Sequence, residues 1–316
     1  MNSTATSQGV KDAMLRISEY VHRTPVLSSE SINHLTGCNL VFKCENFQKV
    51  GAFKYRGATN AVLTLSANEL QLGVITHSSG NHAAALALAA KKAGTKAYIV
   101  MPNNAPEIKK LAVEGYGGII TFCEPNQAAR EKTANEIIDK TGATFVHPYN
   151  NKFVIEGQGT AAFEMLETLG YLPDFILAPT GGGGLTSGTI LAALNFGTSI
   201  KIIGTEPSLA GDAKISMNTG IIQPAFPQQS IADGLLTSLG SMTFEIMQNH
   251  ISEVLNCSEE SIIAAMRMVW ERMKIIIEPS SAVPLACVLE NRSKFENKTV
   301  AIIISGGNVA LNKLPF

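Results

Sequence analysis

The sequence contains no apolar run that approaches the roughly 20 residues needed to cross a lipid bilayer. Its N-terminal stretch, MNSTATSQGVKDAM, lacks the apolar core of a secretory signal peptide. We also find no internal repeat, low-complexity tract or flexible linker. These absences favour a soluble protein that stays in the cytoplasm.

Long blocks of one charge are missing as well. The 25 basic and 26 acidic residues are spread along the chain, so no basic block could neutralise a nucleic-acid backbone. Nor are the five cysteines ever spaced as C-x-x-C, and their number is odd: Cys38, Cys44, Cys123, Cys257 and Cys287. This pattern indicates neither a disulfide framework nor a zinc site and favours reduced core thiols.

What the chain does have is 45% apolar content over 316 residues, enough to fill the cores of two domains. Short β-branched runs alternate with Ala/Leu-rich segments, a pattern typical of an α/β fold with parallel strands and right-handed helical crossovers. The expected strands are residues 40–43, 73–76, 97–101, 118–122, 144–146, 175–178, 200–206 and 300–305. Expected helices between them include residues 81–93, 106–113 and 128–141.

Ligands of open α/β sheets bind beyond the carboxyl ends of the strands, so the turns that follow strands carry functional information. The first such turn, at residues 181–184, consists of four glycines between the apolar run FILAP and a helical segment. Glycine N–H groups and a helix N-terminus together suit a phosphate dianion. A flexible loop is the alternative.

Two further turns stand out. The segment HSSGNH at residues 77–82 follows the strand GVIT and could offer hydroxyls and N–H groups to a carboxylate. Alternatively, Ser78 or Ser79 is only the N-cap of the next helix. The segment SGGN at residues 305–308 follows the strand AIII and could place Ser305 against a ligand ring.

Lys54 lies in the segment GAFKYRGA at the start of an expected helix. A lone lysine is usually a solvated surface residue. Together with SSGNH, GGGG and SGGN, however, this segment resembles the motif set of the fold-type II pyridoxal-phosphate (PLP) enzymes, which are tryptophan synthase β-like. Within them the chain is similar to the serine racemase and serine/threonine dehydratase family. The resemblance runs from about residue 24 to 308 and includes FKCENFQ, IEGQGT, IADG and WERMKIIIEPSSA.

The resemblance implies a role for each matching residue. Lys54 would form an imine with PLP, with Phe53 against the pyridine ring. Asn81 would bond the 3-oxygen and Ser305 the pyridine nitrogen, and the phosphate would be held by Gly181, Gly182, Gly183, Gly184 and Leu185. The substrate carboxylate would meet Ser78, Ser79, Asn81 and His82. A neutral serine, unlike an aspartate, cannot lock a proton on the pyridine nitrogen, so it moderates the electron sink.

The implied fold has two domains, each with a mainly parallel twisted sheet flanked by helices. Residues 1–66 and 150–316 would form a large PLP-binding domain. Residues 67–149 would form a small domain that moves as a lid to exclude water.

The implied activity is serine racemization with accompanying dehydration of serine and threonine. Inversion at Cα needs a proton donor on each face, and Lys54 serves only one. The resemblance places Ser79 on the other face, where dehydratases that only eliminate commonly have alanine. Two alternatives stay open, a purely catabolic threonine dehydratase and an L-threo-3-hydroxyaspartate dehydratase. In the second, Arg130 is a candidate to bind the second carboxylate, and the alternative is that Arg130 is a surface residue of the small domain.

Two more distant alternatives come from other classes. Gly182, Gly184 and Gly188 after one strand, with Glu206 ending the next, imitate the dinucleotide pattern of an NAD-dependent oxidoreductase. That pattern leaves Lys54 unexplained. A scaffold that retained the fold without catalysis is the other alternative.

Glu206, Ala210 and Asp212 match the family's divalent-cation site, whose oxygen ligands suit Mg²⁺, or Ca²⁺ or Mn²⁺. An ordinary acidic surface loop is the alternative. We also expect a homodimer.

The chain departs from the animal serine racemases at three places. Glu30 and Val50 replace hydroxyl residues of their ATP site, so we do not expect ATP activation. Tyr149 replaces an asparagine near the cofactor. The few residues after 308 leave no room for the regulatory domain of biosynthetic threonine dehydratases, so feedback by isoleucine is not expected.

Overall fold

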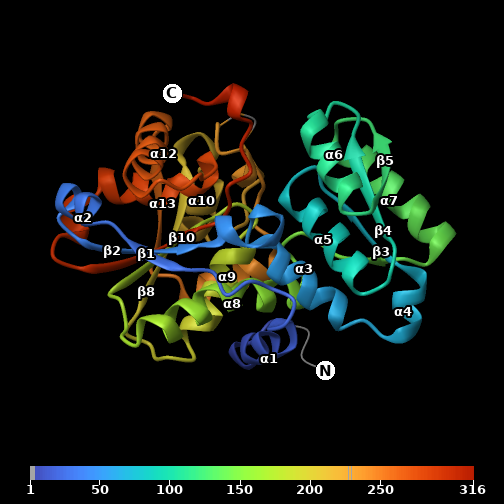
Figure 1. Ribbon diagram of the computed structural model, residues 1–316, viewed down its shortest axis with the longest axis horizontal. Coiled ribbons are helices and arrows are strands. Elements are labelled where there is room, and N and C mark those ends of the chain that lie inside the picture. Colours follow the sequence, from blue (N-terminus) through green and yellow to red (C-terminus); the bar gives the residue numbers. More distant parts are fainter. Residues whose placement is uncertain (1–3, 227, 229) are drawn as a thin grey trace.

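The computed structural model describes residues 4–226, 228 and 230–316. It contains two sheets in two lobes, which lie side by side in Figure 1. The larger sheet has the strand order β1-β2-β10-β7-β8-β9, and only β1 runs antiparallel to its neighbour. In that order its strands are Val26–Ser28, Asn39–Cys44, Thr299–Ile304, Phe175–Pro179, Lys201–Pro207 and Glu253–Cys257.

The smaller sheet has the order β5-β4-β3-β6, and all its pairings are parallel. Its strands, in chain order from β3 to β6, are Val74–His77, Ala97–Pro102, Gly118–Cys123 and Thr144–Phe145. The helices of this lobe are α4 (Ala67–Leu72), α5 (Asn81–Lys92), α6 (Glu107–Gly115) and α7 (Gln127–Thr141). The domain boundaries at residues 66/67 and 149/150, and the mobility of the small domain, stay predictions.

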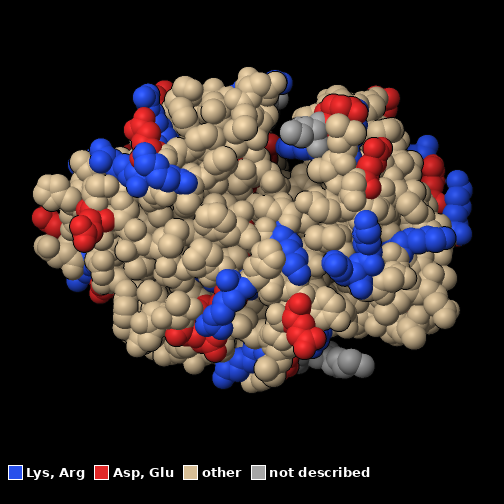
Figure 2. Space-filling view, in the orientation of Figure 1, with Lys and Arg blue, Asp and Glu red and all other residues tan. Residues whose placement is uncertain are grey.

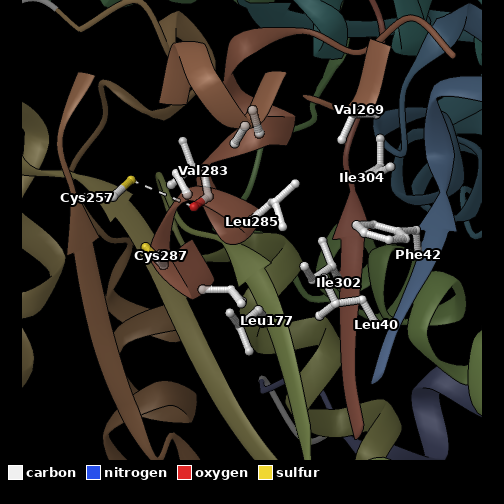
Figure 3. Close-up of a cluster of buried hydrophobic side chains, with 14 of the residues drawn as sticks. Leu40, Phe42, Leu177, Cys257, Val269, Val283, Leu285, Cys287, Ile302 and Ile304 are labelled. Carbon is white, nitrogen blue, oxygen red and sulfur yellow. Dashed lines mark hydrogen bonds between the residues drawn. The ribbon is translucent and has the colours of Figure 1, made fainter. Parts of the chain in front are cut away.

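Successive side chains of a strand point to opposite faces of the sheet. Because both sets are apolar here, helices cover both faces of the larger sheet. Leu40, Phe42, Leu177, Ile302 and Ile304 point to one face and pack with α12 (Glu259–Met273) and α13 (Pro279–Glu290), as Figure 3 shows in part. The strand residues that alternate with these five point to the other face, where they pack with α1 (Ser7–Ile17), α8 (Lys152–Leu169) and α9 (Gly184–Ala193). A strand that is buried on both faces has a continuous apolar run in its sequence, and for this reason these strands could be predicted.

Helix α8 brings two functional segments together through close approaches at glycine. A Cβ on Gly157 would lie 2.6 Å from the Cα of Gly57 in α3 (Lys54–Leu63), and one on Gly159 would lie 2.5 Å from the carbonyl oxygen of Gly188 in α9. Both glycines belong to the segment IEGQGT. The contacts fix α3, which begins at Lys54, relative to α9, which follows the four glycines.

Four buried charges connect α3 to its neighbours, and one of them, Arg56, belongs to α3. Arg56 bonds Glu45 at 2.7 Å and Glu164 at 3.0 Å, and Lys43 bonds Glu164 at 2.6 Å. Arg56, Lys43 and Glu45 are fully buried. Because buried ions are tolerated only when they are paired, this network holds α3 in one position on the larger sheet.

All eight predicted strands are present, and the α/β fold class is confirmed. Strands β1 and β9 were not predicted. The remaining helices are α2 (Glu30–Thr36), α10 (Asp212–Thr219), α11 (Ser241–His250) and α14 (Arg292–Phe295). Within the described residues, we find no helix with both the length and the apolar character that a membrane span requires. Figure 2 shows acidic and basic side chains interspersed over one face of the molecule.

Candidate active site

A cavity of about 480 Å³ is lined by residues from both lobes. Its size is within the range of small-molecule sites. All the residues that we predicted to contact cofactor or substrate line it: Phe53, Lys54, Ser78, Ser79, Asn81, His82, Arg130, Gly181, Gly182, Gly183, Gly184, Leu185 and Ser305. The structure therefore brings together segments that are widely separated in the sequence.

Lys54 is the first residue of α3, and its Nζ donates a hydrogen bond to the carbonyl oxygen of Pro148 at 3.0 Å. The segment before it is tied to the end of β10, because the N–H of Phe53 donates to the carbonyl oxygen of Ser305 at 2.9 Å. Burial lowers the pKa of Lys54 to about 8, against the opposing charge of Glu278. A useful fraction of this amine is therefore neutral near neutral pH, as a nucleophile or base requires.

The four-glycine loop is packed in place and is not a flexible linker. Gly183 has a φ of 84° and caps α9, a backbone conformation that favours glycine. A Cβ on Gly182 would lie 2.3 Å from the ring of Tyr149. Thr243 Oγ1 donates to the carbonyl oxygen of Gly182 at 2.7 Å. The first N–H groups of α9 lack partners within the helix and offer a positive dipole end to an anion.

The segment HSSGNH begins at His77, the last residue of β3, and the rest of it follows the strand as predicted, but its serines do not cap α5. Gly80 is the N-cap residue, with no side-chain cap bond, and Ser78 Oγ accepts from the N–H of Gly80 at 3.4 Å. The N-cap alternative is therefore wrong, and both serines line the cavity.

His82 is buried, and burial lowers the pKa of its imidazole to about 3. Its Nε2 lies 3.2 Å from the carbonyl oxygen of Val146, so a neutral ring must carry its proton on Nε2. The buried Nδ1 has no partner and can only accept. An anion at this place would therefore be held by N–H groups at the start of α5 rather than by the imidazole.

Among the polar residues of the cavity wall that were not assigned from the sequence, Glu278 and Asn308 both contact Asn81. Glu278, the N-cap residue of α13, accepts hydrogen bonds from Asn81 Nδ2 at 3.1 and 3.2 Å. Asn308 Nδ2 donates to Asn81 Oδ1 at 2.9 Å. The segment EPSSA contained the signal for Glu278, but a carboxylate before a proline at a helix start usually indicates a solvated cap.

Ser305 and Arg130 also lie where a ligand could meet them. Ser305 Oγ lies 3.0 Å from Ser281 Oγ, which donates to the carbonyl oxygen of Gly306 at 2.7 Å. Ser305 must therefore be the donor to Ser281 if the two hydroxyls are bonded, and its hydroxyl must turn away from Ser281 to donate to an acceptor in the cavity. Arg130, on α7, has a buried Nε with no hydrogen-bond partner.

The predicted cation site lies apart from the cavity lining. Glu206 lies near the end of β8, and its carboxylate accepts from the N–H groups of Ala213 at 3.0 Å and Lys214 at 2.9 Å. Burial raises its pKa to about 8, and burial raises that of Asp212 to about 6. Asp212 Oδ2 is buried without a partner. Two buried carboxylates and one orphaned oxygen fit a cation, although within the described residues no group of three or more His, Cys, Asp or Glu is placed to hold a metal ion.

The chain matches the family model "Pyridoxal-phosphate dependent enzyme" over residues 17–306, so it belongs to the pyridoxal-phosphate-dependent enzymes. More specifically, it is a fold-type II enzyme of the racemase and dehydratase group.

Three relatives define that group. Over 301 residues the chain is 47% identical to a beta-hydroxyaspartate dehydratase of Paracoccus denitrificans, covering 95% of each chain. It is also 47% identical to a serine racemase of Dictyostelium discoideum over 99% of this chain and 97% of the relative, whose crystal structure gives a TM-score of 0.93 over 97% and 99% of the two chains. A crystal structure of a threonine deaminase of T.th. is 38% identical, with a TM-score of 0.91 over 96% and 98%. The family leaves the NAD-dependent oxidoreductase alternative without support.

Proposed function

We propose that this protein is a PLP-dependent serine racemase that interconverts L- and D-serine and also dehydrates serine and threonine to keto acids and ammonia. The observation that carries the proposal is that Lys54 and Ser79 line the same cavity, beside the four-glycine loop. This gives one cavity two groups that can exchange protons with a substrate. Relatives named serine racemase support the choice of substrate.

PLP fits the residues present. Lys54 offers a primary amine of lowered pKa for its aldehyde, and Gly181, Gly182, Gly183, Gly184 and Leu185 offer N–H groups for its phosphate. Asn81 would bond its 3-oxygen, Phe53 would lie against its ring and Ser305 would meet its pyridine nitrogen. When bound, PLP supplies an electron sink for the bond broken at the substrate's Cα.

Proton transfer is the work of the chain's own residues. Lys54, once released by the substrate amine, takes the Cα proton on one face, for which an amine of pKa about 8 is well suited. Ser79 returns a proton on the opposite face. If Lys54 instead delivers its proton to the β-hydroxyl, water leaves, and the same residues perform dehydration. Ser78, His82 and Asn81 would orient the substrate carboxylate through the start of α5.

The test is incubation with L-serine, L-threonine and L-threo-3-hydroxyaspartate, with separate assays for D-amino acid and keto acid. We expect D-serine from the native enzyme. Ser79→Ala should reduce racemization at least a hundredfold while dehydration stays measurable, because general acid–base catalysis contributes about 10²–10⁴ in rate. Ser78→Ala is the matched control and should change both activities in the same proportion. Equal loss of both activities in Ser79→Ala would contradict its role as second base.

A second candidate function is dehydration of 3-hydroxyaspartate. Arg130 lines the cavity with an unpartnered Nε, which suits a second substrate carboxylate, and the Paracoccus denitrificans relative carries the name of this activity. Under this alternative, Arg130→Gln should lower kcat/KM for 3-hydroxyaspartate about 30-fold more than for serine, because a charge-assisted bond contributes about 2 kcal/mol. If Arg130→Gln lowers kcat/KM by the same factor for 3-hydroxyaspartate and for serine, serine is the better assignment of the substrate.

The proposal extends to a divalent cation, Mg²⁺, Ca²⁺ or Mn²⁺, held by Glu206, Asp212 and the carbonyl oxygen of Ala210. The buried oxygen of Asp212 and the raised pKa of Glu206 support it, since a cation would offset the cost of burying two carboxylates. Exhaustive chelation should lower the melting temperature by several degrees, and adding Mg²⁺ back should restore it. No change in melting temperature or activity would contradict the metal role.

The small domain of residues 67–149 is proposed to move as a lid. Lys109 on α6 and Asp233 in the short helix Asp233–Leu235 form an ion pair of 2.8 Å, and both line the cavity. This contact joins the two lobes where a lid would close. Free and ligand-bound structures with no relative rotation would refute the motion. The homodimer, the absence of ATP activation and a cytoplasmic location stay predictions.

A further inference from the structure

Glu278 is an acidic residue of the cavity wall to which the proposed mechanism gives no role. Two acids line the cavity within the described residues, Asp233 and Glu278. Asp233 is paired with Lys109. Glu278 is only 7% exposed and is bonded by an amide. A buried carboxylate is costly, so its presence in a ligand cavity calls for a function.

The contacts of Glu278 fix the amide of Asn81. An ionised carboxylate can only accept, so Asn81 must turn its Nδ2 toward Glu278. Its Oδ1 then faces Asn308 Nδ2, which also donates to the carbonyl oxygen of Val50 at 2.7 Å. Both partners therefore demand the same orientation. If the two carboxylate oxygens, at 3.1 and 3.2 Å, share one hydrogen of Asn81 Nδ2, the second hydrogen can point to a ligand in the cavity.

Glu278 and Lys54 line the same cavity, so the carboxylate also acts on the amine through its charge. Burial lowers the pKa of Lys54, and Glu278 is the group that opposes this shift. Burial raises the pKa of Glu278 itself to about 7, and the charge of Asp233 also raises it. The hydrogen bond from Asn81 and the charge of Lys109 lower it. The charged groups around this carboxylate are thus Lys54, Asp233 and Lys109.

We propose that Glu278 is a positioning residue of the active site, whose carboxylate fixes the Asn81 amide and stabilises the ammonium form of Lys54 across the cavity. This inference rests on the proposed function, because it assumes that Lys54 and Asn81 meet the cofactor. Capture of the cofactor needs the neutral amine of Lys54. Glu278 therefore raises the pH at which the apoprotein takes up PLP, against the effect of burial on Lys54.

The test measures PLP capture by the apoprotein, followed as the rise of visible absorption at a series of pH values. In the native protein the rate should rise with pH through a midpoint near 8. In Glu278→Gln, which keeps an acceptor for Asn81 but carries no charge, the midpoint should fall by about one unit, because an opposite charge at close range shifts a pKa by about that much or more. At pH 7 the native Glu278 carboxyl, with a pKa of about 7, is only partly ionised, so this variant should capture PLP only about twofold faster than the native protein there.

Two further variants separate charge from structure. Glu278→Asp keeps the charge and should bring the midpoint back toward the native value, which a merely structural role would not do. Glu271→Gln changes the net charge equally at an exposed site and should leave the midpoint unchanged. If Glu278→Gln and the native protein share one midpoint, this inference alone is overturned. If the native protein captures no PLP at any pH, the proposed function falls and this inference with it.

Discussion

Replacing Arg56 tests whether the buried charge network holds the helix that carries Lys54. Arg56→Met removes bonds to Glu45 of 2.7 and 2.8 Å and to Glu164 of 3.0 Å. In this variant Glu164 still accepts a hydrogen bond from Lys43. The carboxylate of Glu45, however, has only the hydroxyl of Thr24, at 2.5 Å, as a direct side-chain partner. Leaving a buried charge uncompensated costs about 3–5 kcal/mol. The free energy of unfolding should fall by that amount, a large share of the roughly 5–15 kcal/mol typical of a folded protein.

The assay is urea unfolding of the apoprotein, followed by circular dichroism. Arg267→Ala is the matched control, because the Arg267–Glu271 pair has the same 2.7 Å separation but is exposed, and it should show no measurable change. If Arg56→Met is too unstable to study, Arg56→Met with Glu45→Gln should recover part of the loss by removing the stranded charge. Equal stabilities of Arg56→Met and Arg267→Ala would refute the reasoning.

Two further predictions concern the cavity. Gly182→Ala should weaken PLP binding at least tenfold because the new Cβ would lie 2.3 Å from the Tyr149 ring, whereas Gly115→Ala, with open space around it, should bind PLP normally in the same absorbance titration. The pKa of His82 lies near 3 when folded and near 6.5 when unfolded, so the unfolded chain binds the proton first and stability falls as the pH drops below about 6.5. From pH 7 to 5 this residue should cost about 2 kcal/mol of unfolding free energy, and His82→Asn should show a correspondingly smaller loss. An unchanged pH dependence in His82→Asn would contradict this assignment.

The strands that could be predicted are those whose packing leaves a mark in the sequence. Strands β10 and β7 are buried on both faces and give the apolar runs AIII and FILA. Strand β9 lies at a sheet edge, and its partly exposed Glu253 and Asn256 break the apolar run. Strand β1 has three residues and pairs antiparallel at the other edge, which a search for parallel units does not find.

The site could be predicted where motifs follow strands, and it could not where partners come from distant segments. Lys54, the glycine loop and the segment HSSGNH lie after strands or at helix starts, as their sequence context indicated. Arg56 and Glu164 are 108 residues apart, so their pairing leaves no local pattern. The contact between Glu278 and Asn81 joins the two lobes across 197 residues and is visible only once both are folded.

The most direct measurement is the attachment point of the cofactor. The protein should be incubated with PLP, reduced with borohydride, digested and analysed by mass spectrometry. The proposed function predicts one pyridoxyl group per chain, on the peptide that contains Lys54, and loss of the yellow colour on reduction. A label on other lysines with Lys54 unmodified, or no label after PLP is supplied in excess, would contradict it.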